Sequence, residues 1–181
     1  MALIFVFLDG WGLGEPAEYN PQQAHPSPFF GRLLGAPLTR AAVQSGPLLL
    51  LRGIDAGLGV AGAPQSATGQ TALFTGVNAP ALLGEHMAAF PNGRLREVIA
   101  EHSLLKRAVE RGHTATFANA YNDMYWRYVE EKRLRHSATT LTNLAARLPF
   151  RSFEDLQAGR ALYWDITHSM LRLRLGREAA R

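Results

Sequence analysis

The sequence predicts an α/β fold, in which a mostly parallel sheet carries helices on both of its faces. Residues 2–8 (ALIFVFL) are apolar without interruption and rich in branched and aromatic side chains, as in a parallel strand that is covered on both sides. A second apolar segment at 47–54 is followed by a glycine-rich loop at 53–69 and then by a predicted helix. Alternating strands and helices favour a mostly parallel sheet with helices on its faces.

Each element of the first half is justified by its own residues. The opening strand is predicted to end at Asp9, and residues 10–28 are expected to form a long irregular loop, because they hold three Gly and four Pro among polar residues. Ser27 is expected to cap a short helix that runs to about Leu34, with Pro28 in its first turn. A helix is expected at 70–75, after the glycine-rich loop.

The second half is dominated by helical patterns. Apolar residues at helical spacing within 95–111 predict two short helices that stop at Gly112, and residues 114–118 (TATFA) predict a strand. Three further helices are expected to begin at polar caps, which are Asn122, Ser137, and Ser152 with Asp155 as a capping box. Residues 161–175 fit a strand or a helix by pattern alone.

Composition limits the class of protein. A chain of 181 residues, 47% hydrophobic and 19% charged, fits a single α/β domain over 1–181 without an internal repeat or linker. The absence of Cys leaves oxygen and imidazole as the metal ligands to consider. Residues 2–8 are far shorter than the roughly 20 residues that span a bilayer, which predicts a cytoplasmic protein without a membrane partner. The net charge of +4 is spread along the chain and does not predict nucleic-acid binding.

Two features could carry chemistry. Asp9 closes the predicted opening strand, so its carboxylate is expected to project into the crevice above the sheet, although an Asp in this position is about as often a simple turn former. Residues 62–76 place small and hydroxyl side chains before a helix, whose first amides would attract a phosphate near Gly69, Gln70 and the Thr71 hydroxyl. A P-loop is excluded, because Gln70 replaces its Lys and Pro64 its Gly. By itself, such a turn is more often structural.

Three segments resemble known enzymes. FVFLDGWGLG at 5–14 resembles the amino-terminal metal motif of cofactor-independent phosphoglycerate mutases, and SATGQTALFTG at 66–76 resembles the loop that carries the hydroxyl nucleophile in the alkaline phosphatase superfamily. Residues 91–121 are similar to the region after the nucleophile helix in a small branch of uncharacterised bacterial metalloenzymes. The resemblance implies an alkaline phosphatase-like core and metal-dependent transfer or hydrolysis of a small phosphorylated or related ester.

The resemblance also implies roles for single residues. Asp9 would bind a divalent ion, and Thr71 would be the nucleophile, with its oxygen on the same ion. Two ions of Mn, Zn or Mg are expected in a complete family member. From the residues themselves, Gly69 and Gln70 are expected to contact phosphate. Asn119, which follows the predicted strand at 114–118, could donate to the phosphate, although an Asn there is more often a loop or cap residue. His86 and Arg94 are weaker candidates, for which a surface role is more common.

The family completes its metal site with carboxyl-terminal motifs that this sequence lacks. Those motifs are an Asp shortly before Gly-His, an Asp-His pair and a further His, and the nearest approximation, Asp165 with His168, has the wrong spacing. The sequence therefore predicts a core without its carboxyl-terminal part, with an exposed sheet edge that an oligomer could cover, and with little or no activity. The alternative is a non-catalytic module that binds a phosphorylated metabolite or is completed by a partner.

Overall fold

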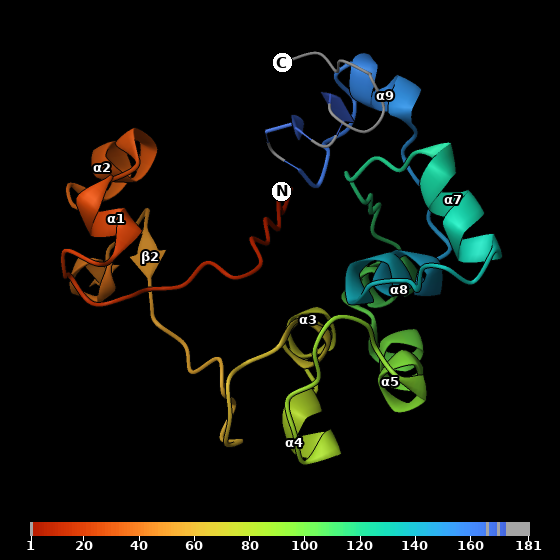
Figure 1. Cartoon of the computed structure of the whole chain (residues 1–181), viewed down its shortest axis with the longest axis horizontal. Helices are drawn as coiled ribbons and strands as arrows, with labels where there is room; N and C mark the ends of the chain where they lie inside the picture. The colour runs from red at the N-terminus through yellow and green to blue at the C-terminus, as the bar shows by residue number, and fades with distance from the viewer. Residues whose placement is uncertain (1, 166, 170, 173–181) are drawn as a thin grey trace. The chain divides into compact units, whose positions relative to one another are not determined.

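The computed structural model describes residues 2–165, 167–169, 171 and 172. Its contacts group into two compact units, Met1–Ala56 and Gly57–Arg181, and each is described by itself (Figure 1). We call the second one the helical unit. The prediction that residues 1–181 form one domain stays a prediction.

The first unit is built from short local elements. Two helices both begin with proline, which suits the first helical position because it lacks an amide hydrogen. The predicted helix after Ser27 is confirmed, and Gly35 ends it with a φ of 70°. The elements are α1 (Pro21–Ala24), α2 (Pro28–Leu34), the 3-10 helix η1 (Arg40–Ala42), β1 (Gln44–Ser45) and β2 (Leu50–Leu51). The two strands pair antiparallel, with Gln44 opposite Leu51.

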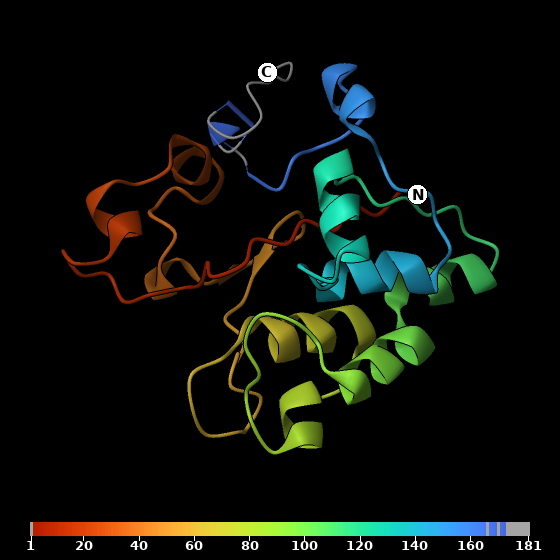
Figure 2. The same cartoon turned by 45° about the vertical axis from the view of Figure 1, so that its right-hand side comes forward.

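The helical unit packs three of its helices against one another. Helices α3, α5 and α8 are in mutual contact (Figure 2). A core cluster of Ala67, Ala79 and Leu95 joins α3, α4 and α5, and a second cluster forms around Ala120, Phe153, Leu156 and Leu171. The helices are α3 (Ser66–Thr75), α4 (Ala79–Leu83), α5 (Gly93–His102), α6 (Leu104–Glu110), α7 (Asp123–Glu130), α8 (Ala138–Ala145) and α9 (Phe153–Gln157).

Three of the predicted helix caps are confirmed, whereas the side chain of Ser27 makes no capping hydrogen bond at the start of α2. Asn122 and Ser137 accept hydrogen bonds from the amides of Tyr125 and Thr140, and Ser152 forms a capping box with Asp155. The predicted pair of helices within 95–111 is also present, as α5 and α6. Ser103 separates them by capping α6 and by donating its hydroxyl to the carbonyl oxygen of Thr142 at 2.9 Å.

The predicted fold class is wrong. In the described part of the chain, the only ladder is the antiparallel pair β1–β2, and helices make up most of the regular structure. Among the described residues, parallel pairing is limited to two isolated bridges, Asn119 with Leu162 and Ala120 with Arg151. A mostly parallel sheet with helices on both faces is therefore absent from the described residues.

The physical reason lies in what an apolar run can specify. Residues 2–8 form no strand, and Leu3, Ile4 and Val6 are 88%, 83% and 73% exposed. A continuous apolar sequence predicts burial, but a strand also needs a neighbouring strand to form a hydrogen-bond ladder. In a parallel sheet, the neighbouring strand is distant in sequence, so the apolar run itself does not specify it. Residues 114–118 likewise form no strand, and the segment at 47–54 contributes only β2, which pairs with residues next to it in the chain.

Candidate functional site

Asp9 lies in a turn of the first unit. Asp9 is exposed. The next residue, Gly10, has a φ of 72°, which is the left-handed conformation that glycine adopts without a steric penalty. The carboxylate is thus presented by a turn rather than by the end of a strand. Thr71 belongs to the helical unit, so the predicted meeting of Asp9 and Thr71 on one ion stays a prediction.

Thr71 lies in the second turn of α3 and faces the interior. It is 0% exposed, and its hydroxyl donates to the carbonyl oxygen of Ala67 at 2.6 Å. Thr75 repeats the arrangement one turn later by donating to the carbonyl oxygen of Thr71, also at 2.6 Å. The Thr71 hydroxyl would have to leave this bond before it could bind an ion or attack a substrate.

The start of α3 is occupied by another part of the chain. The amides of Ala67 and Thr68 donate to the carbonyl oxygen of Met87 at 3.0 and 3.4 Å, and the Met87 amide donates to the Thr68 hydroxyl at 3.2 Å. The Gly69 amide donates to the carbonyl oxygen of Gln65, as inside any α-helix. Amides that were expected to meet a phosphate are therefore bonded within the protein, and the first two would become available only if the Met87 segment moved.

Ser66 is a hydroxyl residue that was not among the predicted site residues. The helix was expected to begin at Gln70, but it begins four residues earlier, and Ser66 is its first residue and is half-buried. The signal was present in the sequence, because the buried residues of α3 recur at helical spacing from Ala67 onward. They are Ala67, Thr68, Thr71, Phe74 and Thr75. Three of them are threonines, which a hydrophobicity pattern does not count as core residues.

The remaining candidates are scattered. Asn119 takes part in a backbone bridge with Leu162, and the His86 ring nitrogen Nε2 lies 3.1 Å from the carbonyl oxygen of Val60. Arg94 is exposed in the first turn of α5, and Asp165 accepts hydrogen bonds from the amide and hydroxyl of Thr167. His168 has a φ of 57°. Within the described residues, no three His, Asp or Glu side chains lie close enough together to hold a metal ion.

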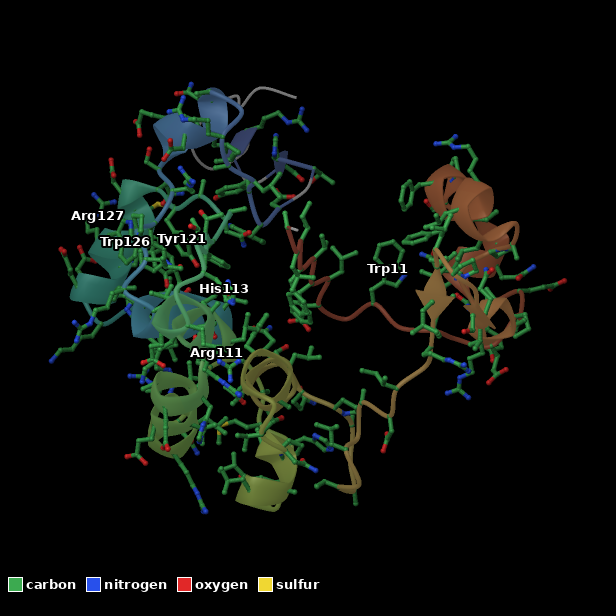
Figure 3. The ribbon with its side chains drawn as sticks, turned by 180° about the vertical axis from the view of Figure 1, so that it is seen from behind. Trp11, Arg111, His113, Tyr121, Trp126 and Arg127 are labelled. Atoms are coloured by element: carbon green, nitrogen blue, oxygen red, sulfur yellow. The ribbon has the colours of Figure 1, made fainter. Side chains whose placement is uncertain are left out.

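An aromatic cluster joins α7 to the segments around it. Tyr121 and Trp126 lie close together in the helical unit (Figure 3), with ring centroids 5.5 Å apart, and the Trp126 ring lies 4.9 Å from that of Phe150. The Tyr121 hydroxyl lies 2.7 Å from the Thr140 hydroxyl, and Tyr125 places its hydroxyl 2.9 Å from Nδ1 of His136. Tyr125 and Trp126 also pack against each other, with ring centroids 5.1 Å apart.

Burial shifts the acidity of this cluster. Burial is the largest cause that raises the pKa of Tyr121 to about 12, against the opposing effect of the Thr140 hydrogen bond. The pKa of Tyr125 is also raised by burial. The pKa of His136 is lowered, first by burial and then by the positive charge of Arg96. The cluster therefore holds neutral tyrosines and an imidazole that resists protonation.

No family model, curated protein or solved structure matches the chain. Among the described helices, none has the length and apolar character that crossing a membrane requires.

Proposed function

We propose that the chain belongs to a metal-dependent enzyme that transfers or hydrolyses a small phosphoester, and that it has little activity in this form. The observation that carries the proposal is the position of Ser66 as the first residue of the ten-residue helix α3. The positive end of a helix dipole stabilises an anionic phosphoryl group beside it. The resemblance of residues 5–14 and 66–76 to motifs of the alkaline phosphatase superfamily supports the same function. A cytoplasmic location is part of the proposal.

The proposed roles differ in how well the residues suit them. Asp9 suits a divalent ion such as Mn, Zn or Mg, because its carboxylate is carried by an exposed turn. Thr71 does not suit that ion while its hydroxyl donates to Ala67 from a buried position. A bound ion would favour the deprotonated form of a hydroxyl and neutralise charge on phosphoryl oxygens. The nucleophile proposed from the sequence is Thr71, and Ser66 is the alternative that the start of α3 favours.

Turnover of p-nitrophenyl phosphate with added Mn²⁺ tests the proposal. We expect slow, Mn²⁺-dependent hydrolysis that Asp9→Asn lowers by about tenfold or more, because a removed metal ligand commonly weakens metal affinity and rate together. Glu18→Gln is the matched control, since Glu18 is an exposed carboxylate of the same unit. Ser66→Ala and Thr71→Val then show which hydroxyl is required. If Thr71 reacts, Thr71→Ser should keep the activity that Thr71→Val loses.

Two results would contradict the enzyme proposal. One is turnover that neither hydroxyl substitution changes. The other is the absence of Mn²⁺-dependent turnover combined with Mn²⁺ binding, measured by calorimetry, that is the same in the Asp9→Asn variant. Fast hydrolysis by the unmodified chain would contradict the expectation of low activity.

A non-catalytic role is the second candidate, and two contacts favour it. The Thr71 hydroxyl is used inside the protein, and the Met87 carbonyl occupies two amides at the start of α3. A module of this kind would bind a phosphorylated metabolite, or would be completed by a partner chain, without transferring the phosphoryl group. Saturable binding of a phosphorylated metabolite without any Mn²⁺-dependent turnover would favour this role.

A further inference from the structure

Two arginines of the helical unit are held on the same short segment. Nε of Arg96, on α5, donates to the carbonyl oxygen of Pro91 at 3.3 Å. The guanidinium carbon of Arg135, which precedes α8, lies 5.4 Å from the centre of the Phe90 ring. Because Phe90 and Pro91 are adjacent, two cationic groups from positions 39 apart in the chain contact the same segment.

Neither arginine is neutralised by an acidic side chain. Within the described residues, no carboxylate lies within ion-pair distance of Arg96 or Arg135. Glu131, an acidic residue near Arg135 in sequence, pairs with Arg133 at 3.2 Å instead, and Arg133 also stacks on Tyr128. A guanidinium carries five N–H donors, so most of the donors of both groups remain for a ligand.

His136 adds a third donor next to Arg135. Its Nδ1 lies 2.9 Å from the Tyr125 hydroxyl, so Nε2 carries the proton of the neutral ring when that hydroxyl donates. The charged or titratable groups that act on the ring are Arg96 from α5 and Tyr125 from α7, and Arg135 is its neighbour in the chain. The charge of Arg96 acts on the His136 ring and helps to lower its pKa.

We propose that Arg96, Arg135 and His136 form a binding site for one phosphate group of a small ligand. Two guanidinium groups suit a tetrahedral dianion, because each can donate two parallel hydrogen bonds to a pair of its oxygens. A single carboxylate offers only two oxygens and one charge. The site offers two arginines, whereas nucleic acid needs a row of cations along its backbone. The site includes neither Ser66 nor Thr71, so its residues differ from the proposed nucleophiles.

Phosphate titration of the full chain, followed by the histidine signals in NMR spectra, tests the site. Ionic strength is held constant with NaCl, and no metal is added. We expect a saturable shift of the His136 signal with phosphate and a much weaker one with acetate. Arg96→Gln and Arg135→Gln should each weaken phosphate binding about tenfold or more, which is the usual effect of losing a charge-assisted hydrogen bond. Arg133→Gln is the control and should change binding less than twofold, since Arg133 is already paired.

Sulfate provides a second measurement, because its charge does not change near neutral pH. A bound dianion favours the imidazolium form, so sulfate should raise the pKa of His136, and Arg96→Gln should remove most of that rise. The exposed positions of both arginines keep the variants folded, which unchanged spectra elsewhere would verify. A shift that grows linearly with phosphate, or one that Arg133→Gln weakens as much as Arg96→Gln does, would overturn the proposal. Ser66→Ala should leave phosphate binding intact even if it abolishes turnover.

Discussion

Replacing Leu95 with Ala is expected to lower the free energy of unfolding of the helical unit by about 2–5 kcal/mol. Leu95 is 0% exposed and belongs to the core cluster with Ala67 and Ala79. The two buried alanines have little side chain with which to fill the space that the substitution would open. The cost should therefore include the energy of an unfilled cavity in addition to the lost burial of the leucine.

Urea unfolding, followed by far-UV circular dichroism, measures this effect. Leu73→Ala is the matched control, since Leu73 is a leucine of α3 that is 43% exposed and should lose about 1 kcal/mol or less. Equal losses in the two variants would show that the cluster of Ala67, Ala79 and Leu95 is not the stabilising core of the unit.

The features that were predicted correctly from the sequence are local ones. Asn122, Ser137 and Ser152 cap helices because each side chain bonds an amide only three residues ahead, so the information lies within a few positions. Proline at the start of α2 and glycine at its end act over similarly short distances. Such signals need no knowledge of what packs against the helix.

The features that were predicted wrongly depend on distant residues. Residues 2–8 have the composition of a central strand, but no hydrogen-bond partner for them can be read from the segment itself. The same limit applies to the candidate site. The sequence shows that Thr71 follows a glycine-rich loop, but the burial of its hydroxyl depends on the helix starting at Ser66, so that Ala67 lies one turn before it. Asp9 was placed at the edge of a sheet that the described residues do not form.

Alkaline solution is expected to destabilise the helical unit through Tyr121. Its pKa is raised from 10.0 to about 12, chiefly by burial, so the folded protein keeps the phenol neutral where the unfolded chain ionises. Below pH 10, the Tyr121 phenol is neutral in both the folded protein and the unfolded chain, so the free energy of unfolding keeps its full value there. As the pH rises toward 12, ionisation stabilises only the unfolded chain. The loss should reach roughly 3 kcal/mol, because each unit of pKa difference corresponds to about 1.4 kcal/mol.

The variant Tyr121→Phe separates this effect from packing. Phenylalanine keeps the ring that packs against Tyr125 and Phe150, at centroid distances of 4.6 and 5.0 Å, and removes the group that ionises. Near neutral pH, the variant should lose about 1 kcal/mol with the hydrogen bond to Thr140. Guanidinium unfolding at a series of alkaline pH values should then show a much flatter decline than in the parent protein. Tyr125 leaves a residual slope, since burial raises its pKa as well. Tyr128→Phe, which keeps Tyr121, should decline as the parent does, and an equally steep decline in Tyr121→Phe would show that another group controls alkaline stability.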